Sequence, residues 1–354
     1  MNAHVTPSSC RPSTRGRARH AALLALLACL ALIVAACSSN SSTQPSALSQ
    51  SAASTAPPSL TLYTSVTQNT VDSVVAGFKS VHPGASVTVF RATTGAINAR
   101  LAADERTGGV RADVIWGTDP LSMQAYAAQG LLRDKPIASP TGIPTQYETN
   151  ALYPTRLLYV VIVARKGLTP LPVSWSDLTN PAYRGKVAIP DPAAAGSALA
   201  ALGYFATAPG YGMSYFQQLK SNGAVQVATV PEVVTDVAQG RYELGITLDS
   251  EVRTAAAAGS PVQIVWPTPG PIALYSPIAV TTATKRVAAA DAFLDYVLSS
   301  DAQKRIAATG WQPVLPGIAG PPIPAGVVPV SADWPSLFGQ QKALLQQYQA
   351  LFGS

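Results

Sequence analysis

Short apolar segments alternate along the chain with stretches in which apolar residues recur every three or four positions. Leu60–Tyr63 predicts a strand, and the stripe of Val71, Val74, Val75 and Phe78 after it predicts a helix. The same succession follows twice, with strands at 85–90 and 112–116 that each precede a helix. We expect the helix after the third strand to begin with Asp119 as N-cap and Pro120 in its first position. Three successive strand ends therefore lead into helix N-termini.

The same rhythm restarts in the second half of the chain. The apolar run 157–163 predicts a long strand that carries the chain into a second lobe. Strands follow at 187–189, 243–248 and 278–280, and helices at 197–205, 231–239, 287–298 and 301–308. This alternation is typical of α/β proteins with parallel sheets, whose ligands bind outside the carboxyl ends of the strands. A last apolar stripe at Leu344, Leu345, Tyr348 and Leu351 predicts a helix that packs on the body.

The N-terminal 36 residues are typical of an export signal. Four arginines lie between residues 11 and 19, and residues 21–36 contain only Ala, Leu, Ile, Val and Cys. Val34-Ala35-Ala36-Cys37 resembles a bacterial lipobox, which implies cleavage before Cys37 and a lipid on its sulfur. The uncharged Ser, Thr, Ala and Pro stretch that ends at residue 59 predicts a flexible tether, because it cannot bury enough apolar surface to fold.

Composition narrows the chemistry of the mature chain. Of the 24 basic residues, the four arginines leave with the signal, so 20 remain against 18 acidic residues, and this balance does not favour nucleic acid. After cleavage before Cys37 and lipidation of its sulfur, the mature chain has no free thiol, and His82 is its one histidine. A cysteine nucleophile, a disulfide and a histidine-rich zinc site are therefore excluded.

Several short motifs carry a resemblance to a known family. They are Tyr63-Thr64-Ser65, Val81-His82-Pro83-Gly84, Thr93-Thr94-Gly95, Ala112-Asp113-Val114-Ile115-Trp116, Trp175-Ser176-Asp177-Leu178, Tyr183-Arg184-Gly185-Lys186, Asp191-Pro192, Ser299-Ser300-Asp301-Ala302-Gln303 and Gly310-Trp311-Gln312-Pro313-Val314. In this order the set resembles the substrate-binding lipoproteins of ABC importers, in the branch that binds ferric ion, 2-aminoethylphosphonate and hexose phosphates. The resemblance extends over about Leu60 to Pro316.

The resemblance implies the type 2 periplasmic-binding-protein fold, with two Rossmann-like α/β lobes joined by a hinge of crossing strands. We expect residues 1–36 to be the signal peptide, 37–59 the linker, 60–160 and 277–320 the first lobe, 161–276 the second lobe, and 321–354 a tail helix. The function implied is capture of a small solute by hinge closure and delivery to the permease and ATPase subunits of an importer. We expect a monomer, lipid-anchored outside the cytoplasm, with no enzymatic activity and no cofactor.

The candidate site follows from the strand ends and from the family pattern. The Thr93-Thr94-Gly95 turn resembles the Ser-Thr-Gly element of the phosphonate and sugar-phosphate binders, and Gly196-Ser197 offers similar donors from the other lobe. Hydroxyls and free N–H groups at a helix N-terminus suit phosphate or phosphonate oxygens. The predicted ligand-binding residues are Thr64, Ser65, Thr93, Thr94, Gly95, Thr118, Asp119, Gly196, Ser197, Asp249, Glu251 and Tyr275.

Two alternatives stay open at this point. The first alternative is a ferric-ion receptor. This chain has Asp249-Ser250-Glu251 where the ferric binders of the branch have paired tyrosines. Ferric ion would therefore have to bind to Asp119, Asp249 and Glu251. A secreted enzyme would use Asp249 and Glu251 as acid and base. Within the anion model, Asp249 or Glu251 would bind the ammonium of a ligand such as 2-aminoethylphosphonate.

Overall fold

The computed structural model describes residues 57–134, 149 and 151–353. The predicted signal peptide, Cys37 and the linker up to residue 56 lie outside the described residues. Within the described part, no helix combines the length and the apolar character needed to cross a membrane.

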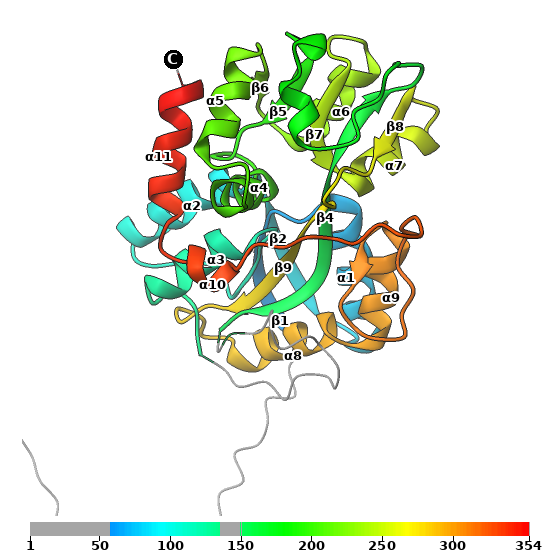
Figure 1. The fold of residues 1–354 in the computed structure, drawn as a ribbon. Coiled ribbons are helices and arrows are strands. Elements are labelled where there is room, and N and C mark those ends of the chain that lie inside the picture. Colours follow the sequence, from blue (N-terminus) through cyan, green and yellow to red (C-terminus); the bar gives the residue numbers. More distant parts are fainter. Residues whose placement is uncertain (1–56, 135–148, 150, 354) are drawn as a thin grey trace, which may run out of the picture. The chain divides into compact units, whose positions relative to one another are not determined.

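Strands and helices alternate as the sequence pattern predicts (Figure 1). The strands are β1 (Ser59–Thr64), β2 (Ser86–Arg91), β3 (Val114–Trp116), β4 (Tyr153–Arg165), β5 (Val187–Pro190), β6 (Val225–Val227), β7 (Leu244–Leu248), β8 (Val262–Val265), β9 (Ile272–Val280) and β10 (Gln312–Pro313). The helices are α1 (Gln68–Val81), α2 (Thr94–Arg106), α3 (Pro120–Ala128), α4 (Gly196–Thr207), α5 (Met213–Ser221), α6 (Val230–Ala238), α7 (Asp249–Ala257), α8 (Val287–Val297), α9 (Ser300–Ala308), α10 (Trp334–Leu337) and α11 (Gln341–Phe352). Two short 3-10 turns, at Ser176–Thr179 and Pro181–Tyr183, precede β5.

The strands form two parallel groups joined by antiparallel strands. The sheet order is β2-β1-β3-β9-β4-β7-β5-β6, with β8 and β10 paired to β4. β1 is parallel to β2 and β3, and β5 is parallel to β6 and β7. β9 is antiparallel to β3 and to β4, which in turn is antiparallel to β7. We call the β2-β1-β3 group with its helices the first lobe and the β7-β5-β6 group with its helices the second lobe, and β4 and β9 join them (Figure 1).

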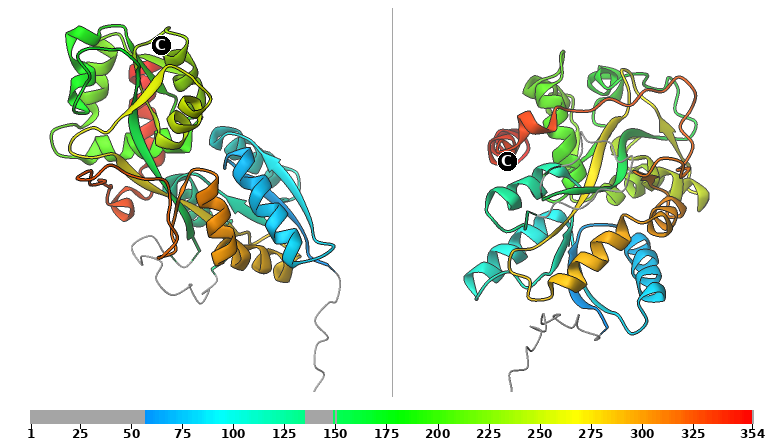
Figure 2. Two further views of the ribbon diagram at one scale, coloured as in Figure 1. Left: turned by 90° about the vertical axis from the view of Figure 1, so that its right-hand side faces the viewer. Right: turned by 90° about the horizontal axis from the view of Figure 1, so that it is seen from below.

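The first lobe forms as its periodicity predicts. Val71, Val74, Val75 and Phe78 of α1 are all buried, and α3 begins at Pro120. Asp119 is its N-cap, because the Asp119 carboxylate accepts the backbone N–H of Ser122 at 2.7 Å. Helices α1 and α9, which are far apart in sequence, lie side by side in this lobe (Figure 2).

The second lobe contains elements that the sequence pattern did not predict. Helix α7 begins at Asp249, directly after β7, where we expected only the end of a strand. α5, β6 and β8 were likewise not predicted, and all three have short or weakly patterned sequences. The predicted C-terminal helix is confirmed as α11, whose Leu344, Tyr348 and Phe352 are buried against the body.

Candidate functional site

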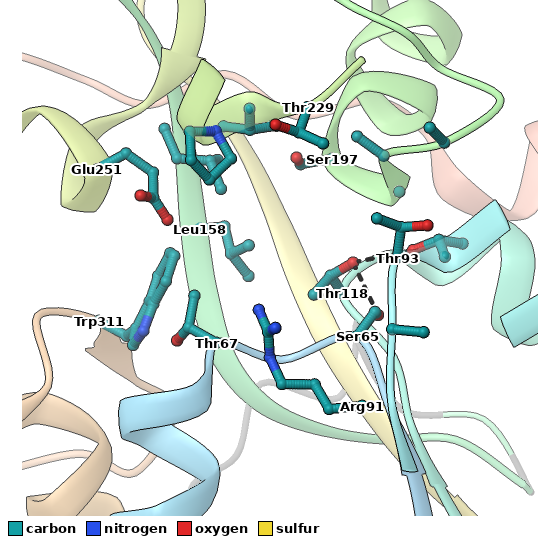
Figure 3. A pocket seen from close by; sticks show the side chains of 18 of the residues that line it. Ser65, Thr67, Arg91, Thr93, Thr118, Leu158, Ser197, Thr229, Glu251 and Trp311 are labelled. Atoms are coloured by element: carbon teal, nitrogen blue, oxygen red, sulfur yellow. Dashed lines mark hydrogen bonds between the residues drawn. The ribbon is translucent and has the colours of Figure 1, made fainter. Parts of the chain in front are cut away.

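One cavity of about 260 Å³ lies between elements of both lobes (Figure 3). Its lining comes from the ends of β1, β2, β3 and β7, from the hinge strand β4, and from the N-terminal residues of several helices. This is the edge at which parallel α/β sheets bind ligands. The volume lies just below the range of drug-sized pockets, so the cavity suits a small solute.

Five helix N-termini contribute to this cavity. Residues at or next to the N-caps of α1, α2, α4, α6 and α7 line it, among them Thr67, Thr94, Gly196, Thr229 and Leu248. α1, α4 and α7 have no side-chain cap hydrogen bond, so their first N–H groups keep donor capacity. The positive ends of these helix dipoles favour an anionic ligand.

A chain of hydroxyl groups occupies one side of the cavity. The Thr118 hydroxyl lies 3.2 Å from the Ser65 hydroxyl and 3.3 Å from the Thr94 hydroxyl. Ser197 of α4 lies on the same side, facing this chain from the second lobe (Figure 3). Hydroxyls of this kind can turn a proton toward a ligand oxygen, because each is both donor and acceptor.

Two arginines add positive charge. Arg91 is the last residue of β2, its Nε donates to the Val66 carbonyl at 2.7 Å, and its guanidinium extends toward the cavity (Figure 3). Arg156 of β4 is fully buried, and none of its three side-chain nitrogens has a hydrogen-bond partner among the described residues. Its Cζ lies 4.1 Å from the centroid of the Trp311 ring. Burial lowers the pKa of Arg156 to about 9, so the guanidinium stays cationic at neutral pH.

Glu251 is the acidic side chain in this lining. It lies in the first turn of α7, on the same side of the cavity as Trp311, and the guanidinium of Arg91 extends toward this side (Figure 3). Burial raises the pKa of Glu251, while the charges of Arg156 and Arg91 lower it. With two arginines and five helix N-termini against one carboxylate, the cavity is electrostatically positive.

The structure brings together most of the predicted site residues. Ser65, Thr93, Thr94, Thr118, Gly196, Ser197 and Glu251 line the cavity. Gly95 lies beside it, and its N–H donates to the Ala194 carbonyl of the second lobe at 3.2 Å. Thr67, Arg91, Arg156, Thr229 and Trp311 also line the cavity, although the sequence reasoning did not select them.

Besides Gly95, four predicted residues lie outside the cavity lining. Thr64 is buried and donates to the Trp116 carbonyl at 2.8 Å. Asp249 binds the Arg253 Nε at 3.2 Å instead of facing the cavity. Tyr275 lies in the core on β9, because both faces of that strand are buried. Asp119 is occupied as the N-cap of α3.

Asp119 nevertheless has one unsatisfied oxygen. Its side chain is fully buried, and its second carboxylate oxygen has no hydrogen-bond partner among the described residues. A Cβ on Gly196 would overlap this carboxylate, so Asp119 of the first lobe lies directly against the start of α4 in the second. Burial raises the pKa of Asp119 to about 6.

We expect Asp119→Asn to stabilise the protein above pH 6 and to have little effect near pH 4. Because the pKa of Asp119 is raised on folding, its ionisation destabilises the native state as the pH rises from about 4 to above 6, by about 3 kcal/mol in total. Asparagine keeps the capping oxygen and cannot ionise. Urea unfolding of both proteins between pH 4 and pH 8 measures the difference. A difference that is constant over this range would contradict the assignment.

The family comparison agrees with this fold. Residues 60–312 match the family model described as "Bacterial extracellular solute-binding protein". The chain is 29% identical over 143 residues to the spermidine/putrescine-binding periplasmic protein of Escherichia coli K12, and 25% identical over 144 residues to an uncharacterized protein of Haemophilus influenzae. These matches span only 40% and 42% of the length of those two proteins.

Solved structures share the fold over most of this chain. The periplasmic binding protein AfuA of Actinobacillus pleuropneumoniae, with fructose-6-phosphate bound, superimposes with a TM-score of 0.75 at 19% identity, covering 83% of this chain and 98% of AfuA. Iron-bound HitA of Pseudomonas aeruginosa gives 0.73 at 17% identity, with 83% and 99% covered. The two-lobed fold is thus that of periplasmic binding proteins, and the family match extends over more than half of the chain. The chain belongs to the bacterial extracellular solute-binding proteins.

Proposed function

We propose that this protein is the receptor of an ABC importer for a small anionic solute, a phosphonate or an organophosphate. The observation that carries the proposal is the convergence of five helix N-termini, Arg91 and Arg156 on one cavity that contains a single carboxylate. The hydroxyls of Ser65, Thr94, Thr118 and Ser197 suit the oxygens of a phosphoryl or phosphonyl group. An anion that binds both lobes would hold them together and so present one closed surface to the permease.

The proposal includes the anchorage and the partners of the receptor. Lipid on Cys37 would hold the protein at the outer face of the cell membrane, and the uncharged segment after it would leave the body free to reorient. We propose that the body works as a monomer and delivers its solute to the permease and ATPase subunits.

The two alternatives have less support. Among the described residues, no three His, Cys, Asp or Glu side chains lie close enough together to hold a metal ion. Asp119 caps α3 and Asp249 binds Arg253, and neither lines the cavity, which leaves Glu251 as the one carboxylate in the lining that could bind ferric ion. The enzyme alternative needs Asp249 and Glu251 as acid and base, but the Asp249 carboxylate binds Arg253.

A panel of solutes tests the proposal by thermal unfolding of the ligand-free protein. We expect stabilisation by phosphate esters or 2-aminoethylphosphonate and none by ferric citrate or putrescine. A ligand at 100 times its dissociation constant adds about 2.7 kcal/mol to the free energy of unfolding, which raises the midpoint by several degrees. Stabilisation by ferric ion or putrescine alone would overturn the proposal.

Two substitutions locate the anion. Thr94→Ala and Ser197→Ala each remove a hydroxyl from the cavity lining, and we expect each to weaken binding about fivefold, because one hydrogen bond contributes about 1 kcal/mol. Thr107→Ala, at the far end of α2, is the matched control and leaves affinity unchanged. Unchanged affinity in both cavity variants would show that the hydroxyls of Thr94 and Ser197 do not bind the anion.

A further inference from the structure

Arg156 lines the cavity beside Trp311 and has a complete set of unused hydrogen-bond donors. Its Nε, Nη1 and Nη2 have no acceptor among the described residues, although the side chain is fully buried. The Trp311 ring covers the guanidinium at 4.1 Å and offers only a cation–π contact. A buried charge without a partner costs several kcal/mol, so the native site calls for an anionic group at this position. A carboxylate matches the planar donor fork of arginine in a bidentate contact.

Glu251 faces the same end of the cavity from the second lobe. Figure 3 shows its carboxylate on the side of Trp311, away from the hydroxyls of Ser65 and Thr118. Arg156 and Glu251 influence each other electrostatically, but the two side chains form no ion pair within 4 Å. The gap between these opposite charges therefore offers an acceptor and a set of donors to a third group.

The other end of the cavity has hydroxyl groups and helix N-termini and no carboxylate in its lining. Ser65, Thr118, Thr93 and Ser197 lie there, together with the N-termini of α2 and α4, and Arg91 extends between the two ends (Figure 3). A ligand with one anionic group at this end would leave Arg156 unpaired. A ligand that places an ammonium at Glu251 but has no anionic group near Arg156 would also leave the guanidinium unpaired.

We infer that the solute carries an amino-acid head group, with its carboxylate on Arg156 and its ammonium on Glu251, and a phosphoryl or phosphonyl group at the hydroxyl end. This inference rests on the proposed function and specifies the substrate class of the same cavity. Each of the three charged ligand groups then meets a protein group of opposite polarity. The cavity of about 260 Å³ limits the connection between the groups to a short aliphatic chain.

Four probes separate the contributions of the head group by calorimetry on the ligand-free protein. O-phospho-L-serine carries all three groups, O-phosphoethanolamine lacks the carboxylate, 3-phosphonopropionate lacks the ammonium, and inorganic phosphate lacks both. We expect O-phospho-L-serine to bind tightest and the loss of either group to weaken binding at least about tenfold, because a site built for a charged partner rejects an analogue that lacks it.

Two variants assign each ligand group to its residue. Glu251→Gln should weaken O-phospho-L-serine and O-phosphoethanolamine and leave 3-phosphonopropionate unchanged. Arg156→Met should weaken O-phospho-L-serine and 3-phosphonopropionate and leave O-phosphoethanolamine unchanged. Glu105→Gln and Arg106→Met, at exposed positions near the end of α2, are the matched controls and should change no affinity.

The outcomes distinguish this inference from the proposal on which it rests. Equal affinity for the four probes, or variants that weaken all probes alike, would overturn the amino-acid head group and leave the anion receptor standing. Failure of all four probes to bind would overturn the phosphorus-anion receptor itself.

Discussion

Arg156→Met is expected to raise the thermal midpoint of the ligand-free protein by several degrees. The wild-type guanidinium is buried with no hydrogen-bond acceptor, and only the Trp311 ring and the distant charge of Glu251 offset its desolvation. Replacing a buried charge by an apolar side chain of similar length commonly stabilises a protein by about 1–4 kcal/mol. Methionine also keeps the packing against Trp311, because its side chain is flexible and apolar.

Differential scanning calorimetry measures this effect on protein that has been unfolded, dialysed and refolded to remove bound solute. Arg91→Met is the matched control, because Arg91 is exposed and its Nε bonds the Val66 carbonyl. This control should leave the midpoint unchanged or lower it. A lower midpoint in Arg156→Met than in the wild type would mean that the guanidinium stabilises the empty protein, and that a ligand is not needed to balance its charge.

The opposite effects expected on stability and on binding have one cause. The Arg156 charge lowers the free energy of unfolding of the empty protein, because it is buried without a partner. The same charge attracts a solute group of opposite charge, so it raises ligand affinity. The side chains that raise ligand affinity are then the ones whose removal stabilises the apo form.

The helix N-termini around the cavity could largely be predicted from the sequence. Turn and capping residues are local signals, so Thr93 before α2 and Asp119 before α3 identify where strands give way to helices. Because parallel strands end at one edge of a sheet, the hydroxyls of Ser65, Thr94 and Thr118 could be expected to lie together. The hydrogen bonds among them agree with this expectation.

The residues that were missed depend on long-range packing. Arg156 stands directly before the apolar run 157–163, whose pattern indicates a strand, and nothing local shows that its side chain lines a cavity. Trp311 belongs to a motif near the end of the family match, but its contact with Arg156 is made across 155 residues of sequence. Tyr275 is one of the predicted ligand-binding residues, yet β9 is buried on both faces and takes the side chain into the core.

Helix α7 was missed for a related reason. Asp249 directly follows β7, and no glycine or proline between the strand and the helix marks where the strand ends. The apolar stripe of the helix is also weak. Its formation separates the two carboxylates, because Asp249 turns to Arg253 four residues on, whereas Glu251 faces the cavity. The helix thus decides which of the two acids can meet a ligand.

Gly196→Ala is expected to weaken solute binding about five- to 150-fold while leaving the ligand-free protein folded. An added Cβ would overlap the carboxylate of Asp119 and lie 2.8 Å from the Thr94 hydroxyl, and both of these residues belong to the first lobe. Gly196 is the first residue of α4 in the second lobe, where alanine is favourable for the helix itself. If solute capture closes the lobes, the overlap is absent in the open form and penalises the closed one, at a cost of about 1–3 kcal/mol.

Calorimetric titration with the solute identified by the thermal panel measures the loss, and the unfolding midpoint shows that the apo protein is intact. The double variant Gly196→Ala with Asp119→Ser provides the decisive control, since serine still caps α3 but has a shorter side chain. Recovery of affinity in this variant locates the penalty at the Asp119–Gly196 contact. Full affinity in Gly196→Ala alone would mean that the two lobes do not approach at this contact when solute is bound. The backbone of Gly196 does not have a positive φ, so the fold itself does not require glycine at this position. In that case, neither closure nor binding would require it either.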